Sequence, residues 1–125
     1  MSDAGPGTAG KLTTHVLDTA GGRPAAGMTI ELYRLADGGR EHLGTVATND
    51  DGRCDQPLLA GDDFGRGEYE LIFHVGAYFQ TESGQDRQPA FLGLVPVRFG
   101  IAKPGEHYHV PLLVSPFAYS TYRGS

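Results

Sequence analysis

Residues 28–35 read Met-Thr-Ile-Glu-Leu-Tyr-Arg-Leu, a stretch in which apolar and polar side chains largely alternate. Successive side chains of an extended strand point to opposite faces, so Met28, Ile30 and Leu32 share one face. Residues 68–75, Glu-Tyr-Glu-Leu-Ile-Phe-His-Val, repeat this period of two, with every second side chain apolar. Both stretches therefore predict strands that turn one face toward a hydrophobic core.

Turn-forming residues divide the rest of the chain into similarly short segments. Gly21–Pro24 and Asn49–Gly52 are clusters of glycine, proline, asparagine and aspartate, the residues that tight turns favour. Residues 76–83 carry few β-branched side chains and can form a short helix. Seven or eight short strands at this spacing predict an all-β sandwich or barrel. The remaining strand-like segments are residues 11–18, 42–48, 94–101, 107–114 and 119–123.

Length and charge exclude several classes of protein. The chain has 125 residues, enough for one domain, which we place at residues 11–125 behind a disordered tail of residues 1–10. Fifteen acidic residues against ten basic ones, with no run of Lys or Arg, argue against nucleic-acid binding. No apolar stretch approaches the roughly 18 residues of a membrane helix, and the first ten residues do not resemble a secretory signal. The sequence thus predicts a soluble cytoplasmic protein.

His15 lies in a strand-like segment in which Leu12, Thr14 and Val16 share one face. The alternation places His15 on the opposite face, away from the main core. A solvated strand histidine is one interpretation. The other is a functional group, because a neutral imidazole accepts protons near neutral pH.

His107 and His109 are two residues apart and would share one face of a strand over residues 107–114. Such a pair can ligate zinc or copper, with His15 as a third candidate ligand. Acid–base catalysis is the alternative, and it requires less convergence of side chains.

Arg53 directly follows the turn cluster at Asn49–Gly52. It can form a surface ion pair with Asp50 or Asp51, or it can direct its guanidinium toward carbonyl or carboxylate oxygens of a ligand. The neighbouring Cys54 is the only cysteine, which excludes an internal disulfide and cysteine-rich metal sites. We expect it to be a small buried packing residue rather than a reactive one.

The C-terminal sequence is unusual because chain ends tend to be polar and frayed. Residues 111–117 are mostly apolar and are a candidate interface surface. Residues 119–125 then contain Tyr119 and Tyr122 and keep a strand-like pattern almost to the last residue. An edge strand that simply ends would explain this pattern. A terminus held in place because it lines a site or an interface would explain it as well.

Three motifs together resemble a known family, the transthyretin-like 5-hydroxyisourate hydrolases. Residues 12–19, Leu-Thr-Thr-His-Val-Leu-Asp-Thr, resemble the opening motif of that family, and residues 49–53, Asn-Asp-Asp-Gly-Arg, its central arginine motif. Residues 108–113 and 119–125 are similar to the C-terminal block, which ends in Tyr-Arg-Gly-Ser. The motifs occur in the family's order, and the likeness extends over residues 11–125.

This resemblance implies a transthyretin-like β-sandwich of two four-stranded sheets with one short helix, assembled as a homotetramer. It implies hydrolysis of 5-hydroxyisourate to 2-oxo-4-hydroxy-4-carboxy-5-ureidoimidazoline, a step of urate degradation, without metal or organic cofactor. His107 lies outside the family's catalytic set. The alternative within the same fold is a transthyretin-type carrier that binds a small molecule without reacting it.

By the same resemblance, His15, Arg53 and His109 are the catalytic residues, and Tyr122 and the terminal Ser125 contact the substrate together with His15 and Arg53. Chemically, a pair of histidines can activate water and return a proton. A fixed arginine can stabilise the negative charge that develops on the attacked carbonyl oxygen.

Overall fold

The computed structural model describes residues 10–84 and 88–124. Nine residues of the expected tail, 1–9, and the terminal Ser125 lie outside the described residues. Gly10 is buried, and its backbone N–H donates to the Pro104 carbonyl over 2.9 Å. The described residues include no helix long and apolar enough to cross a membrane.

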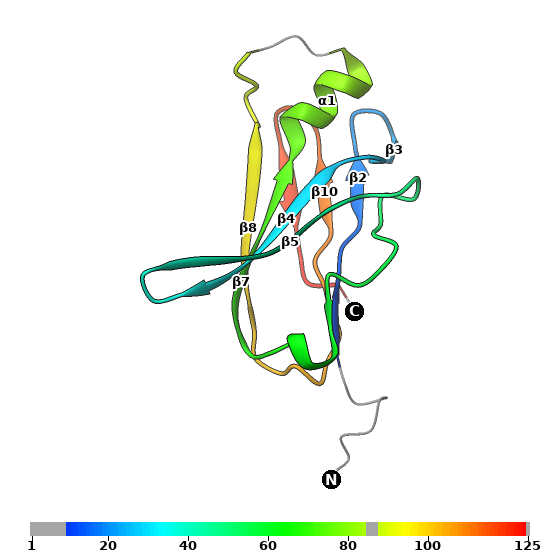
Figure 1. Cartoon of the computed structure of the whole chain (residues 1–125). Helices are drawn as coiled ribbons and strands as arrows, with labels where there is room; N and C mark the ends of the chain where they lie inside the picture. Colours follow the sequence, from blue (N-terminus) through cyan, green and yellow to red (C-terminus); the bar gives the residue numbers. More distant parts are fainter. Residues whose placement is uncertain (1–9, 85–87, 125) are drawn as a thin grey trace.

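One layer of the molecule is a four-stranded antiparallel sheet with continuous ladders, in the order β5-β4-β7-β8 (Figure 1). The inner strands β4 and β7 confirm the strands predicted at residues 28–35 and 68–75. The first begins one residue later than predicted and the second one residue earlier. The predicted strand at residues 94–101 is confirmed without displacement, whereas β5 begins three residues before the predicted 42–48. The strands are β4 (Thr29–Ala36), β5 (Gly39–Ala47), β7 (Gly67–His74) and β8 (Leu94–Ile101).

The other layer is made of shorter strands in two hydrogen-bonded groups, β6-β1-β9 and β11-β10-β2-β3. Its two central strands run parallel: β1 pairs with β9, and β2 continues beside β10. The layers together form a transthyretin-like sandwich of roughly two four-stranded sheets. The strands are β1 (Lys11–Thr13), β2 (Val16–Asp18), β3 (Arg23–Pro24), β6 (Leu59–Ala60), β9 (Tyr108–His109), β10 (Leu112–Val114) and β11 (Tyr119–Thr121).

The predicted single strands at residues 11–18 and 107–114 are each interrupted in the structure. The first is broken at Thr14 and His15, and the second at Val110 and Pro111. Proline has no N–H to donate to a ladder, which accounts for the second break. Two backbone hydrogen bonds of 2.9 Å, from Val110 N–H to Thr13 O and from Leu112 N–H to His15 O, connect the two segments where their strands are interrupted.

Within residues 10–84 and 88–124 there is one α-helix, α1 (Val75–Ser83), which follows β7 and covers one end of the sandwich (Figure 1). It confirms the helix predicted at residues 76–83 and ends at Gly84, whose φ of 65° suits a residue without a side chain. The buried Asp18 carboxylate accepts a 2.9 Å hydrogen bond from the Tyr78 hydroxyl. This bond attaches the helix to the layer of short strands.

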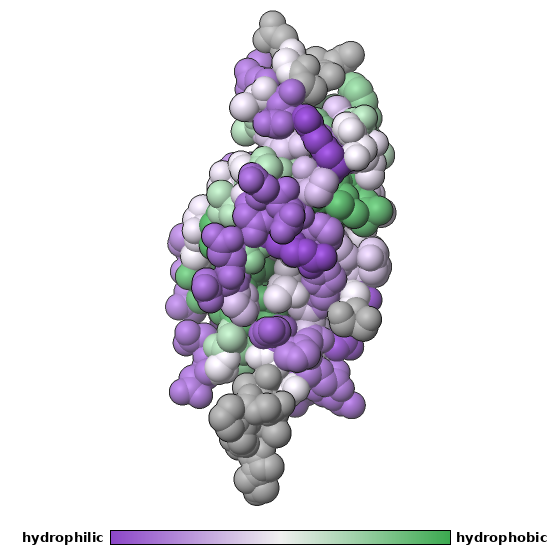
Figure 2. Space-filling model, turned by 90° about the vertical axis from the view of Figure 1, so that its right-hand side faces the viewer, coloured by the Kyte–Doolittle hydropathy of each residue, from purple (hydrophilic) through white to green (hydrophobic). Residues whose placement is uncertain are grey.

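The core lies between the two layers and contains Tyr69, Leu71 and Phe73 from the predicted buried face of β7. Leu112 and Val114 are also fully buried there, so the expectation that the whole apolar stretch 111–117 forms surface is wrong. The reason is that β10 is an inner strand, between β11 and β2. Hydrophilic side chains dominate the face of the molecule drawn in Figure 2.

Candidate active site

His15 lies at the break between β1 and β2, and its ring is half-buried on the outer face of the short-stranded layer. Its neighbours Thr14 and Val16 are buried, as the alternation predicts. His15 Nε2 is 2.9 Å from the Asp51 carbonyl oxygen. A carbonyl oxygen only accepts hydrogen bonds, so Nε2 carries a proton in this arrangement.

Arg53 is delivered to His15 by a compact loop. Asn49 Oδ1 accepts hydrogen bonds from the backbone N–H of Asp51 over 2.9 Å and of Arg53 over 3.1 Å. Gly52 has a φ of 75°, and a Cβ there would lie 2.4 Å from the Val16 carbonyl oxygen. An isolated bridge pairs Arg53 with His15, so the loop replaces the missing ladder at the strand break.

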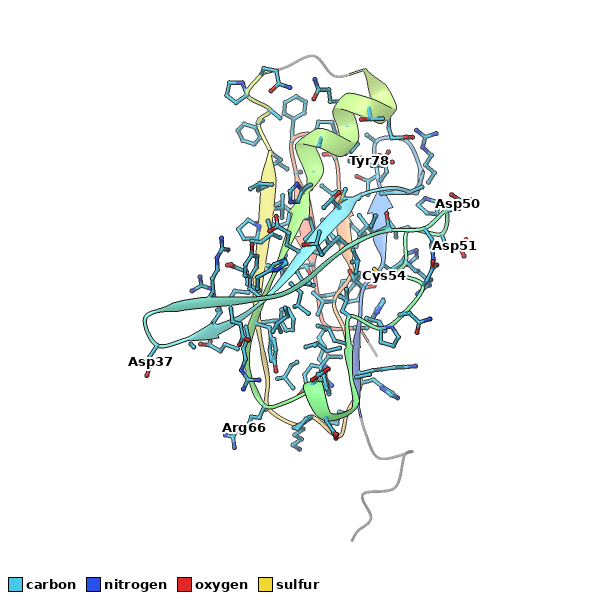
Figure 3. The ribbon with its side chains drawn as sticks, in the orientation of Figure 1. Asp37, Asp50, Asp51, Cys54, Arg66 and Tyr78 are labelled. Carbon is cyan, nitrogen blue, oxygen red and sulfur yellow. The ribbon has the colours of Figure 1, made fainter. Side chains whose placement is uncertain are left out.

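The acidic side chains of this loop leave Arg53 unpaired. Figure 3 shows Asp50 and Asp51 at the loop tip, and among the described residues no ion pair involves Arg53. Cys54 is half-buried against the core, and burial raises the pKa of its thiol. A raised thiol pKa lowers the thiolate fraction, in agreement with a packing role.

His109 is the last residue of β9 and pairs in register with Thr13 of β1. Its Nδ1 is 2.9 Å from the Thr13 hydroxyl oxygen. Burial lowers the pKa of His109, and the positive charges of Arg53 and His15 lower it further. The lowered pKa keeps the His109 imidazole neutral near pH 7. The backbone bonds from Val110 N–H to Thr13 O and from Leu112 N–H to His15 O hold the segments of His109 and His15 side by side.

The C-terminal segment packs directly on His109. Gly124 N–H donates to the His109 carbonyl over 2.7 Å, and a Cβ on Gly124 would lie 2.7 Å from His109 Cδ2. Arg123 does not face the histidine pair. Its guanidinium donates to Glu106 and to the His107 carbonyl, and it lies 4.1 Å from the centre of the Tyr108 ring. Arg123 therefore fixes the segment that positions Gly124.

An open hollow adjoins His109 and is lined by His109, Tyr122, Arg123 and Gly124. Tyr122 is 60% exposed, so its hydroxyl is available to a bound ligand. Ser125, the other residue expected to contact substrate, is outside the described residues. The hollow is open to solvent and has both polar and apolar lining, which a small heterocyclic ligand can use.

The arrangement does not resemble a metal centre. No group of three His, Cys, Asp or Glu side chains in the described part of the chain is placed to hold a metal ion. His107 is exposed and contributes its backbone carbonyl to Arg123. The cluster is instead suited to acid–base chemistry beside a fixed positive charge.

Sequence reasoning did not single out Thr13, Asn49 or Gly124, although each of them holds a site residue. Asn49 had a local signal, because asparagine commonly bonds to backbone N–H groups two residues on. Thr13 and Gly124 had none, because their contacts with His109 join segments about 100 and 15 residues apart. Only the parallel pairing of β1 with β9 and the return of the C-terminal segment bring them together.

Comparison with known proteins identifies the family of this chain. The sequence model of the HIUase/Transthyretin family matches residues 12–124. The 5-hydroxyisourate hydrolase of Mesorhizobium japonicum is 58% identical over the full length of both chains. The 5-hydroxyisourate hydrolase 2 of Rhizobium meliloti is 60% identical, over 93% of this chain and 97% of that one.

Solved structures of similar fold include members of the same family and a longer enzyme. An (S)-allantoin synthase superimposes with a TM-score of 0.88 at 48% identity, over 94% of this chain but only 44% of that longer one. Sea bream transthyretin in complex with thyroxine superimposes with a TM-score of 0.81 at 29% identity, over 91% and 94% of the two chains. By its sequence motifs, its sandwich fold and its relatives, this chain belongs to the HIUase/Transthyretin family.

Proposed function

We propose that this protein is a 5-hydroxyisourate hydrolase that forms 2-oxo-4-hydroxy-4-carboxy-5-ureidoimidazoline in urate degradation. The proposal is supported by the bridge that pairs His15 with Arg53 and by His109, which lies on the adjacent hydrogen-bonded segment and lines an open hollow. The names of the relatives supply the substrate. The lowered pKa of His109 supports a proton-accepting role at neutral pH.

The proposed reaction is attack of water on an amide-type carbonyl of the six-membered ring. A bond forms between the water oxygen and the carbonyl carbon, and the bond from that carbon to the ring nitrogen breaks. One imidazole of the pair takes a proton from the water, and the other helps to return a proton to the departing nitrogen. Arg53 stabilises the charge on the carbonyl oxygen in the transition state.

Substrate recognition in this proposal combines the histidine–arginine cluster with the C-terminal segment. The hydroxyls of Tyr122 and Ser125 would bond to ring N–H and C=O groups. The position of Tyr122 in the lining of the hollow supports its part in this scheme. No metal or organic cofactor is needed for these steps.

We also propose that the protein acts as a homotetramer. The site hollow is open, and a symmetric neighbour would close it while each copy repeats the same site. In the described chain, β8 and β11 are edge strands with one partner each, and Phe117 is 52% exposed beside β11. Gel filtration with light scattering tests the tetramer, and a fully active monomer would refute it.

The predicted cytoplasmic location remains part of the proposal. The single cysteine, which leaves no internal disulfide, suits a reducing compartment. Cell fractionation tests this location.

A carrier is the second candidate, favoured by the structural likeness to transthyretin in complex with thyroxine. A non-reactive binding site has no need for a bridged His15–Arg53 pair beside the segment that carries His109. A carrier would bind an aromatic ligand stoichiometrically and would leave the decay rate of 5-hydroxyisourate unchanged.

The decisive experiment follows the ultraviolet absorbance of freshly generated 5-hydroxyisourate with and without protein, after treatment with EDTA. The substrate decays unaided, so the comparison of rates is the observable. Acceleration that survives EDTA and is lost in His109→Ala supports the proposed hydrolase. No acceleration would favour the carrier, and acceleration that EDTA abolishes would favour a metal site.

A further inference from the structure

The two histidines of the site are held by partners of different chemistry. His15 Nε2 faces the Asp51 carbonyl, which accepts hydrogen bonds and never donates. His109 Nδ1 faces the Thr13 hydroxyl, which can do either. The carbonyl fixes the proton of His15 on one nitrogen, whereas the hydroxyl permits either protonation state at Nδ1 of His109.

The His109 ring is held from two sides. The Thr13 hydroxyl lies 2.9 Å from Nδ1, and the bare Cα of Gly124 lies against the opposite edge near Cδ2. Thr13 is itself fixed, because its carbonyl accepts a 2.9 Å bond from Val110 N–H within the β1–β9 pairing. Among the described residues its hydroxyl has no partner other than His109.

We propose that Thr13 is a positioning residue for the hydrolytic reaction. Its hydroxyl oxygen accepts from Nδ1–H, which holds neutral His109 in the tautomer with a lone pair on Nε2, and it accepts the same bond when His109 is protonated. The ring orientation is thereby kept through both protonation states, and Nε2 remains the nitrogen available to water or substrate. This inference rests on the proposed function, in which His109 exchanges a proton during catalysis.

The neighbouring Thr14 provides a matched control. It is the same residue type on the same segment, but its buried hydroxyl donates to the Val110 carbonyl over 2.7 Å on the core side. Thr14→Val removes a structural hydrogen bond without touching His109. We therefore expect it to lower the melting temperature and to leave kcat within about twofold of the wild type.

The test measures kcat and KM for Thr13→Val, Thr13→Ser and Thr14→Val, with His109→Ala in parallel. Thr13→Val keeps the β-branched shape without the hydroxyl, and we expect kcat to fall about 10- to 100-fold with little change in KM. Thr13→Ser keeps the hydroxyl and should restore most of the rate. Thr13→Ala should behave like Thr13→Val, and it replaces that variant if valine impairs folding.

A second readout is the nitrogen-15 spectrum of the His109 imidazole, because the Nδ1 signal reports its hydrogen-bonded state. We expect this signal to change in Thr13→Val and to be retained in Thr13→Ser and Thr14→Val. A wild-type kcat in Thr13→Val, or a Thr13→Ser variant as slow as Thr13→Val, would overturn the role of Thr13. An active His109→Ala variant would instead overturn the proposed function itself.

Discussion

The two layers of the sandwich differ in the continuity of their strands. The layer β5-β4-β7-β8 has strands of eight or nine residues, paired along most of their length. In the other layer the two central strands are broken, at His15 and at Pro111, into pieces of two or three residues. All the proposed catalytic side chains belong to the broken layer or to the loop bridged to it.

This difference suggests that regular pairing and chemistry are separated in the fold. In a continuous ladder the backbone N–H and C=O groups of an inner strand bond to the two strands beside it, so no further segment can pair there. At a break, backbone groups become available, and the structure pairs His15 with Arg53 and His109 with Gly124. The breaks are thus the points at which distant parts of the chain converge, and the long-stranded layer supplies a stable surface behind them.

The largest expected effect is on catalysis at the first break. We expect His15→Ala to lower kcat by about 10²- to 10⁴-fold, since general acid–base catalysis typically contributes that factor. The ring is half-buried and outside the core, so the melting temperature should change little. The measurement is the steady-state rate, with thermal unfolding in parallel.

The matched control for this prediction is His107→Ala, which removes an exposed histidine whose backbone, not its ring, contacts Arg123. We expect it to retain most of the activity. If the two variants lost activity equally, the site would not be confined to the strand breaks.

The second prediction addresses the continuous layer. Leu71 lies in β7 and is fully buried, so Leu71→Ala should lower the free energy of unfolding by about 2–5 kcal/mol. Below the melting transition kcat should be nearly unchanged. Urea unfolding and kinetics check the two effects, with the partly exposed Leu43→Ala as control, for which we expect roughly 0.5 kcal/mol. A large loss of kcat in folded Leu71→Ala would contradict the separation of the layers.

A smaller effect is expected at the second break, where Gly124 touches His109. The Cβ of Gly124→Ala would come within 2.7 Å of His109 Cδ2, so the imidazole must move. We expect kcat to fall about tenfold, because small displacements of a catalytic group are costly. Gly100→Ala is the control, since a Cβ there meets nothing within 4 Å. Equal rates for both variants would show that the contact with His109 has no role.

Much of the fold could be predicted from local pattern. The alternation in residues 68–75 identified the buried face of β7, because burial on one side of a strand enforces a period of two. The breaks were not predicted, since residues 11–18 and 107–114 have strand-like composition throughout. What interrupts those strands is pairing with the 49–53 loop and the C-terminal segment, together with Pro111, and two of these three causes are tertiary.

The candidate site was predicted less from physics than from resemblance. Residue type and strand parity nominated His15 and His109 without indicating that they converge, and for Arg53 a surface ion pair was the preferred explanation. The three motifs selected these residues together, and their catalytic roles stay predictions. The hydrogen bonds that orient the two histidines, made with Thr13 and with the Asp51 carbonyl, depend on sheet register and loop geometry that no single-residue property encodes.

The smallest expected effect concerns the charge environment that joins the two breaks. Burial lowers the pKa of His109 below its ordinary value of 6.5, and the positive charge of Arg53 contributes further in the same direction. Arg53→Gln removes that charge but not the burial, so the pKa should rise and still remain below 6.5. The group is neutral above its pKa, and in wild type the imidazole should therefore stay neutral to a lower pH than in the variant. Imidazole NMR titration of both proteins measures this without relying on the impaired rate of the variant.

Arg98→Gln, on an exposed side chain of β8 bonded to Glu70, is the charge-matched control and should leave the titration of His109 unchanged. An identical shift in both variants would mean that Arg53 acts only through net charge, and the two strand breaks would then not form one electrostatic unit.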